Sequence, residues 1–571
     1  MKAHFIYIIL TSLLLLPVST FAQDLENIKN EKPFEIHGTV GAGTTVFTSN
    51  SPYQYRDPFA WNAYAGLTMK IYGIELPFSF SISQFSKSYS QPFTQFGLSP
   101  TYKWVTLHLG YRSMTFSRLI FDGQNFLGGG IELKPKWFRF GAFVGRLNKA
   151  INEDISLDHH VQPQYSRLGY GVKIGFEEKF GSININYFHA QDKTSSIKEI
   201  KDTLNRIFPQ ENTALGMNWS FRIIKVISFK GDFAFSVLNR NVFYNPLGTV
   251  NEYEIPKFLT AFQKVNATTV LGYAGNASLG VNLKWFGLTF GYRRIQPEYM
   301  SLGTPYRVTD IEAFSVIGNT SFFKRKVSLN ASFNGQHNNL NKVLLSSIHS
   351  KVGNLNIQIN ANNHWNIAMG TNFAHVIQKD GLVKLSDSIR MNQLMVAAMI
   401  APSYNITSGT LQHSVSSSVG YTNLFDYNPA TSNDVQGDNI NASANYGIQF
   451  LRKYFGLNVG LSYNVYGQKA YRYNSIGTTI GASTQLLKTH TLSLGGNFGY
   501  FFNKSNGVKA GNNFMFSINS GYSVKKHTFG LYASYLISPP VLLNPMDKID
   551  IVPHYVNTTN FSAGVNYSFS F

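Results

Sequence analysis

The sequence predicts an all-β protein, a large antiparallel transmembrane β-barrel, and three observations lead to this fold class. Only 14% of the 571 residues are charged, whereas Phe, Tyr and Trp make up 15%, and soluble proteins carry roughly 25% charged residues. After the amino terminus, no apolar run approaches the ~18 residues that a membrane-spanning helix needs. Apolar and polar residues instead alternate with period two, as in strands that have lipid on one side and a polar lumen on the other.

The first 22 residues are typical of a secretory signal peptide. Lys2 supplies the positive charge, the apolar stretch FIYIILTSLLLL follows, and small residues lead to an expected cleavage near Ala22 after Sec-type export. The alternative is an uncleaved membrane anchor, which the shortness of the apolar stretch disfavours. Residues 23–33 are then a short periplasmic segment and residues 34–571 a single transmembrane barrel domain. The chain has no Cys, which excludes disulfides and thiolate metal sites.

The clearest alternation lies at the carboxyl terminus, where the last residues read FSAGVNYSFSF. Its Ser, Asn and Gly positions would face the lumen, over about the length of a strand that crosses a tilted barrel wall. The same pattern recurs from Phe455 to Tyr463 and from Phe514 to Tyr522. The residues of the last strand that we expect to face lipid are Phe561, Ala563, Val565, Tyr567, Phe569 and Phe571.

The turns predict the number of strands. Short basic or Gly-containing breaks, such as Lys103-Trp104 and Lys525-Lys526, separate alternating runs and are interleaved with longer polar connections. They predict about 26 strands, within a range of roughly 22–28, with short periplasmic turns and longer extracellular loops. A circular barrel of that size would be ~50 Å wide. We therefore expect an obstructed lumen, filled by the loops near residues 190–212 and 238–268, by flattening or by another polypeptide.

Together these features resemble the outer-membrane β-barrel proteins of Gram-negative bacteria. The resemblance rests on the export signal, the alternating body and the aromatic end of the last strand, at Tyr567, Phe569 and Phe571. It implies a protein integral to the cell outer membrane, in contact with lipid and lipopolysaccharide. It also implies that the barrel assembly machinery reads these three residues as a C-terminal signal. Because residues 23–33 are few, we expect neither a typical TonB-dependent receptor with its plug domain nor an Omp85 protein.

The formal net charge of +19 invites a nucleic-acid partner, but no basic segment is followed by a nucleic-acid fold signature. Many cations fall in the short turns, where they can reach lipid headgroups. Other Lys and Arg residues alternate with apolar residues within the strands and would therefore face the lumen. An excess of fixed positive charge on the lumen wall favours the passage of anions. Alternatively, these cations pair with loop carboxylates or lipopolysaccharide phosphates. The candidate lumen charges are Arg112, Arg139, Arg167, Lys173, Arg222, Lys230, Arg293, Glu132 and Asp232.

Motifs for catalysis or cofactor binding are weak. Asp158, His159 and His160 lack a third ligand at a motif spacing, so we expect a solvated loop rather than a metal site. GTVGAG at Gly38–Gly43 is not followed by a helix, and we expect a Gly-rich strand against which a backbone or bulky side chain packs. No nucleophile motif is present. We therefore expect no enzyme, no metal and no cofactor.

The sequence thus favours a conduit across the outer membrane, a porin-like channel for small solutes. The alternative is a structural, secretion or surface-assembly component whose lumen is closed by a partner protein, such as a lipoprotein or a periplasmic protein.

Overall fold

The protein is a closed antiparallel β-barrel of 26 strands, which confirms the predicted fold class and strand number. The structure is a computed structural model. It describes residues 32–51, 56–71, 74–84, 97–153, 162–198, 207–224, 226–246, 263–304, 308–388, 390–469, 471–487, 489, 491–542 and 555–571. The predicted signal peptide and the loop residues Asp158, His159 and His160 lie outside these ranges.

Each strand pairs with its neighbours in the chain, and the short segments β4 and β5 share one position between β3 and β6. The strands are β1 (Glu35–Ser49), β2 (Phe59–Ile71), β3 (Ile74–Ser83), β4 (Gly97–Leu98), β5 (Thr101–Tyr102), β6 (Val105–Ser113), β7 (Asn125–Leu133), β8 (Phe138–Asn148), β9 (Arg167–Glu178), β10 (Gly181–Asp192), β11 (Glu211–Ile223), β12 (Ile227–Asn239), β13 (Thr269–Asn282), β14 (Phe286–Ile295), β15 (Ile311–Phe322), β16 (Val327–His337), β17 (Ser346–Asn360), β18 (Trp365–Asp380), β19 (Asn392–Ser408), β20 (Leu411–Asp426), β21 (Gly437–Phe450), β22 (Phe455–Gln468), β23 (Arg472–Leu486), β24 (Leu492–Ser505), β25 (Val508–Val524), β26 (His527–Leu542) and β27 (Tyr555–Ser570). Two short helical segments, Thr194–Ser196 and Ser432–Val435, lie between strands, and within the described ranges no helix has the length and apolarity to span a membrane.

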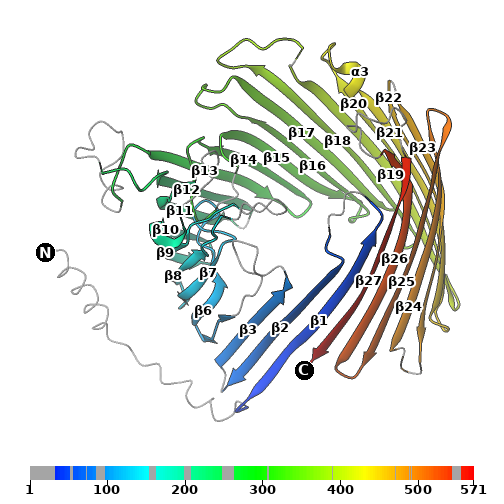
Figure 1. Ribbon diagram of the computed structural model, residues 1–571, viewed down its shortest axis with the longest axis horizontal. Coiled ribbons are helices and arrows are strands. Elements are labelled where there is room, and N and C mark those ends of the chain that lie inside the picture. The colour runs from blue at the N-terminus through cyan, green and yellow to red at the C-terminus, as the bar shows by residue number, and fades with distance from the viewer. Residues whose placement is uncertain are drawn as a thin grey trace.

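The first and last strands close the barrel. β1 pairs with β27 from Thr39 opposite Ser570 to Ser49 opposite Asn560, and Gly38 and Phe571 exchange two backbone hydrogen bonds of 2.9 and 3.0 Å. In Figure 1 the blue β1 accordingly lies beside the red β27. The Gly-rich run in β1 is where bulky groups approach closely, because a Cβ atom on Gly41 would collide with the Tyr64 ring and the Tyr567 carbonyl.

The two rims differ in their connections. One rim carries short turns, such as that between β25 and β26, where Lys525 has a φ of 53°. Left-handed residues of this kind let two strands reverse direction within a few residues. The other rim carries most of the longer connections, including residues 114–124, 240–268 and 296–310. We call these the short-turn rim and the long-loop rim.

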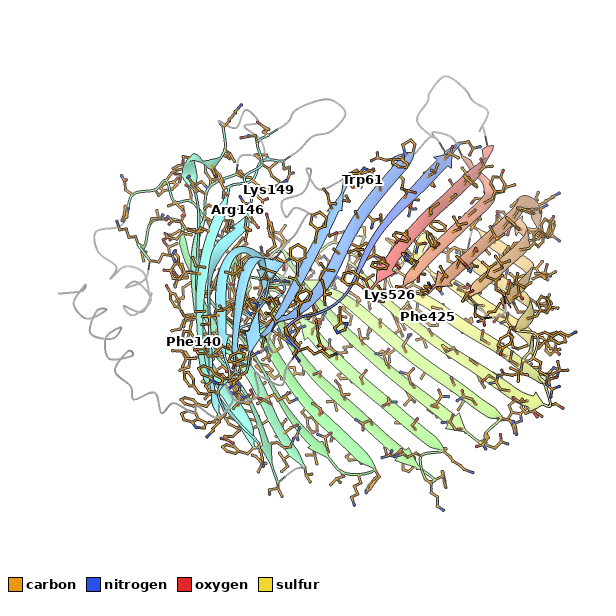
Figure 2. All side chains as sticks on the ribbon, turned by 90° about the horizontal axis from the view of Figure 1, so that it is seen from below. Trp61, Phe140, Arg146, Lys149, Phe425 and Lys526 are labelled. Carbon is orange, nitrogen blue, oxygen red and sulfur yellow. The ribbon has the colours of Figure 1, made fainter. Side chains whose placement is uncertain are left out.

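Side chains alternate between the two faces of the wall, and Figure 2 shows them projecting from both. On β8, Phe140 and Val144 lie on one face, and Arg139 and Phe143 on the other. The first face is mostly apolar along the middle of the strands yet exposed, with Val144 54% exposed. Such a surface is stable only against lipid, so it is the outer face. The face with Arg139 is the inner face.

One expectation about the loops is wrong for the residues described. The end of the connection between β12 and β13, residues 263–268, does not enter the lumen. Val265 is buried against Val237, with Leu215, Phe235 and Leu271 packed around them, all on the outer face. Gln263 and Asn266 are also buried there, bonded to Glu211 and Asn241 backbone carbonyls. This segment therefore thickens the wall from outside.

Deleting the last three residues should prevent barrel formation. Phe569 stacks on Phe571 and lies 4.8 Å from the His527 ring of β26, and Phe571 makes the last backbone bonds of the seam. We expect the truncated chain to lose its heat-modifiable folded form in outer membranes, measured by gel mobility with and without boiling. A Ser570→Ala variant keeps all backbone bonds and serves as the control. Normal amounts of folded truncated protein would contradict this role of the strand end.

Candidate functional site: the inner wall

The inner wall divides into a charged sector and a neutral sector. From β6 to β14 the strand register places the predicted lumen charges on the inner face. For example, Glu132, Gly141 and Lys173 are paired across β7, β8 and β9, so their side chains share the face that carries Arg139. From β16 to β23 the described inner-face positions carry no Lys or Arg, and the charged ones are Asp380 and Asp426 at the long-loop end. The inner-face charges of the first sector are the predicted Arg112, Glu132, Arg139, Arg167, Lys173, Arg222, Lys230, Asp232 and Arg293, together with Glu177 and Asp192.

Several of these cations are held by partners in the wall. Arg112 donates to the backbone carbonyls of Pro77, at 2.8 Å, and Gly97, so it fills the irregular junction between β3 and β6. Arg139 Nε lies 2.9 Å from Glu177 Oε2. Glu177 was not among the predicted lumen anions, although it follows Lys173 and Gly175 on the inner face of β9. Such pairing reduces the field that an ion in the lumen would meet.

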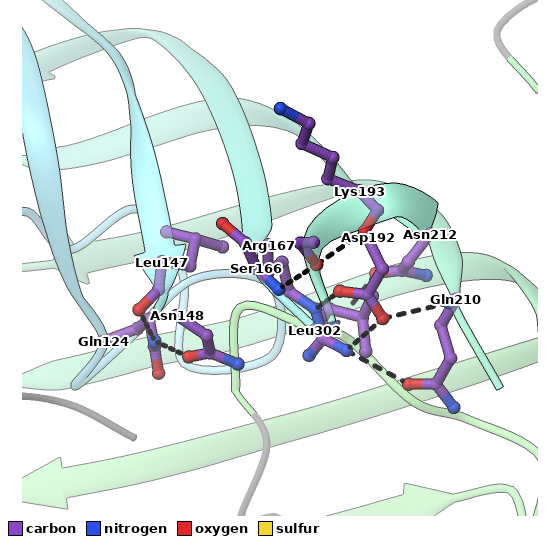
Figure 3. A network of polar contacts seen from close by, with 11 residues as sticks. Gln124, Leu147, Asn148, Ser166, Arg167, Asp192, Lys193, Gln210, Asn212 and Leu302 are labelled. Atoms are coloured by element: carbon purple, nitrogen blue, oxygen red, sulfur yellow. Dashed lines mark hydrogen bonds and ion pairs between the residues drawn. The ribbon is translucent and has the colours of Figure 1, made fainter. Parts of the chain in front are cut away.

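Arg167 belongs to a network at the long-loop rim, shown in Figure 3. Its Nε and Nη2 donate to the two carboxylate oxygens of Asp192 at 2.7 and 3.0 Å, and Gln210 N donates to the same carboxylate at 2.9 Å. The Asp192 side chain is only 3% exposed. A buried carboxylate that accepts a bidentate guanidinium and a backbone N–H is a fixed structural element. It joins the ends of β9 and β10 to the start of β11.

Three predicted cations face the lumen without such partners. Arg222, Lys230 and Arg293 are exposed, and none of their side chains forms a hydrogen bond or ion pair with the part of the chain that the structure describes. Lys173 is intermediate, because its Nζ reaches only the Thr115 carbonyl, at 3.5 Å. Among the predicted lumen cations, these four residues are therefore the ones that an ion in the lumen can approach.

Asp232 has a different role from the one predicted. Its carboxylate is buried and accepts the Ser117 hydroxyl, whose Oγ lies 2.8 and 2.7 Å from its two oxygens. Ser117 belongs to the connection between β6 and β7, residues 114–124, which we call inner loop 1. Asp232 thus anchors a loop against the wall.

A second connection holds inner loop 1 in place. Residues 296–304 between β14 and β15, here inner loop 2, lie directly on it. Tyr299 Oη donates to the Leu119 carbonyl at 2.7 Å, and Ser301 Oγ to the Ile120 carbonyl at 2.6 Å. Inner loop 2 is itself fixed to the wall, because Leu302 N donates to Asn212 Oδ1 at 3.0 Å. Asn212 is fully buried.

The two inner loops cover a hydrophobic core that lies inside the barrel. Phe116 and Phe121 of inner loop 1 pack on Phe143 of β8 and Phe188 of β10, with Phe121 and Phe143 stacked at 4.4 Å. All four rings are at most 4% exposed. Burying large rings contributes ~1.5–3 kcal/mol each relative to exposure. The loops are thus a second layer over the wall from β7 to β15.

Small residues in the wall make room for this layer. A Cβ atom on Gly171 would meet the Phe116 and Phe143 rings, and one on Gly272 would meet the Tyr299 backbone. The inner faces of the same strands carry Ala190, Ala214, Ala234 and Ala274, all fully buried. The inner loops were not predicted, although the sequence contains two signals for them: the apolar residues in SMTFSRLIF, and the Gly and Ala that replace Ser and Asn in this sector.

The neutral sector is open to the lumen. Its inner-face Asn side chains are exposed on strand after strand, and a shallow hollow of about 350 Å³ lies over Gly370, Met399 and Gly420. The hollow is bordered by Asn354, Asn356 and Asn441. Such amide groups can exchange hydrogen bonds with water or a polar solute without favouring either sign of charge. The exposed inner-face Asn residues from β16 to β25 are Asn330, Asn354, Asn356, Asn360, Asn372, Asn405, Asn441, Asn445, Asn458, Asn497 and Asn519.

No protein-family model matches the chain, and no curated protein does. Among solved structures, the P pilus usher PapC translocation pore is 10% identical and aligns over 94% of this chain and 99% of its own, with a TM-score of 0.35. OccAB2 of Acinetobacter baumannii is 11% identical over 69% of this chain and 100% of its own, with a TM-score of 0.30. The ferric citrate transporter FecA is 8% identical over 94% of this chain and 78% of its own, with a TM-score of 0.34. All three likenesses concern the barrel.

The two faces can be tested directly, because the chain has no natural Cys. Asn356 lies on the inner face of β17 and is exposed, whereas its neighbour Leu355 lies on the outer face. We expect Asn356→Cys to react with a membrane-impermeant thiol reagent in intact outer membranes and Leu355→Cys to react at least tenfold more slowly, since a thiol in hydrocarbon does not ionise. Equal labelling, or the reverse order, would show that the faces are assigned wrongly.

Proposed function

We propose that the protein is a conduit across the outer membrane for small, uncharged, hydrophilic solutes, which pass along the neutral sector of the lumen. The observation that carries this proposal is the array of exposed Asn side chains on the inner face of a closed barrel. A solute that leaves water must replace its hydrogen bonds, and amides supply both donors and acceptors. The inner loops narrow the passage from the opposite side.

The proposal includes points that follow from the sequence alone. They are the export signal cleaved near Ala22, a single barrel domain over residues 34–571, and insertion by the barrel assembly machinery. They also include the long-loop rim as the extracellular one and the absence of enzymatic activity. In the described ranges no group of three or more His, Asp or Glu side chains could hold a metal ion.

A second function is favoured by the extent of the inner loops. A circular barrel of 26 strands is ~50 Å wide, and the described inner loops cover only the wall from β7 to β15. A partner polypeptide could fill the space beside the neutral sector, since a neutral hydrogen-bonding wall also suits a polypeptide backbone. The protein would then be a secretion or surface-assembly component. Copurification of a stoichiometric partner from native outer membranes would favour this function over the first.

Solute passage can be measured by the swelling of liposomes that contain the purified barrel. We expect swelling in uncharged sugars, and faster swelling when inner loop 1 is shortened by replacing residues 117–121 with two glycines, because the layer over β7 to β15 is then lost. Heat-modifiable mobility controls for folding of both proteins. A folded barrel that admits no sugar in either form would contradict the conduit.

Ion selectivity tests the four lumen cations. We expect a reversal potential that favours chloride over potassium in a salt gradient, because Lys173, Arg222, Lys230 and Arg293 are inner-face cations that form no ion pair within the described wall. The triple variant Arg222→Gln, Lys230→Gln, Arg293→Gln should lose most of this preference. Arg472→Gln, on the outer face of β23, is the matched control and should change nothing. A cation-selective wild type would show that the loops supply the missing negative charge.

A further inference from the structure

The outer face carries a group of basic side chains where the long-loop rim meets the apolar band, over β14 to β18. The register aligns Arg294, Glu312, His337 and His349 in one row across four strands. Lys351 and His375 are paired two residues from this row, on the side of the short-turn rim. Lys379 lies two residues from the row on the side of the long-loop rim. We call this group the basic rim patch: Arg294, His337, His349, Lys351, His375 and Lys379.

Contacts hold part of the patch rigid. Glu312 accepts Arg294 Nη1 at 3.0 Å and Tyr292 Oη at 2.6 Å, and His337 Nε2 lies 3.5 Å from the same carboxylate. The His337 and His349 rings stack at 5.2 Å with an interplanar angle of 7°. His375 Nε2 lies 2.9 Å from Asn392 Oδ1. Imidazoles arranged in this way present their remaining nitrogens at fixed positions on the outer surface.

The patch has more positive than negative charge. Glu312 is the one carboxylate in its row, and it already binds Arg294. Lys351 and Lys379 are exposed, and neither forms an ion pair within the described chain. These two ammonium groups face outward, and no carboxylate of the described residues neutralises them. A surface of this kind attracts anionic groups from the surrounding phase.

The position of the basic rim patch along the barrel axis shows which layer of the membrane surrounds it. On β18, Trp365 stacks on Tyr404 near the short-turn rim, and ten residues later comes His375. At ~3.3 Å per residue and a tilt of about 40°, these residues are roughly 25 Å apart along the barrel axis, which is the height of the apolar band of such barrels. Directly below the patch, Phe333 and Phe373 are exposed on the same face. The patch therefore lies at the level of lipid headgroups.

We propose that the basic rim patch binds the phosphate groups of a phosphorylated glycolipid in the outer leaflet. The basic rim patch extends from Arg294 on β14 to Lys379 on β18 and so crosses five strands, or roughly 20 Å at ~4.8 Å per strand. That span suits a headgroup with two separated phosphates better than a glycerophospholipid with one. Tyr292, Ser347 and Asn392 supply hydrogen-bonding groups for sugar hydroxyls beside the cations. The proposal needs the barrel and its orientation in the membrane, but not the conduit function.

The test measures binding of purified, folded barrel to phosphatidylcholine vesicles that contain a diphosphorylated glucosamine-disaccharide lipid. Losing two lysine contacts of ~1 kcal/mol each corresponds to about 30-fold weaker binding. We expect that loss for Lys351→Gln, Lys379→Gln. The matched control Lys453→Gln, Lys526→Gln removes the same charge from the short-turn rim and should bind like the wild type. Lys351→Arg, Lys379→Arg keeps the charge and should also bind like the wild type.

Heat-modifiable mobility checks folding, and the single Lys379→Gln replaces the double variant if the latter does not fold. Vesicles with the dephosphorylated glycolipid should bind no better than phosphatidylcholine alone, and vesicles with phosphatidylglycerol should bind clearly more weakly than those with the diphosphorylated lipid. Equal binding by the Gln variant and the wild type would overturn the proposal. So would equal affinity for phosphatidylglycerol, which would show a general anionic surface rather than a glycolipid site.

Discussion

Closure of the sheet is the constraint on which the rest of this structure depends. In hydrocarbon an unpaired backbone N–H or C=O costs several kcal/mol, so a membrane-spanning sheet must have no free edge. β1 and β27 meet this requirement across the seam. Closure gives every strand one face toward lipid and one toward the lumen. Closure therefore creates two distinct surfaces, the divided inner wall and the outer face that carries the basic rim patch.

The inner wall shows how a barrel can vary its lining without changing its sheet. In the sector that faces the inner loops, Gly and Ala replace Ser and Asn, and a compact aromatic core forms where other strands are solvated. This exchange of inner-face side chains leaves the backbone hydrogen bonds of the strands intact. It also leaves the outer face unchanged, because neighbouring residues of a strand point to opposite faces. The predicted lumen cations lie in or beside this sector, on β6 to β14, where Glu177 and Asp192 pair with two of them.

The fold could be predicted from sequence because period-two alternation and short turns are local signals. The partners of individual side chains could not. Asp232 looked like a lumen anion, and only the three-dimensional path of residues 114–124 brings Ser117 to it. Glu177 and Asp192 were overlooked because their pairing depends on the neighbouring strand and the loop after it. Likewise, the outward packing of Val265 depends on a contact with Val237 that no short sequence pattern records.

The second layer over β7 to β15 has a mechanical consequence. Where the inner loops are bonded to the wall, bending the sheet would break buried contacts such as that between Tyr299 and the Leu119 carbonyl. The remaining arc is a single sheet, whose curvature can change while its ladder of hydrogen bonds stays intact. Any change in the cross-section of the barrel is therefore concentrated in the thin arc that contains the seam. The thick arc acts as the stiff frame against which the thin arc flexes.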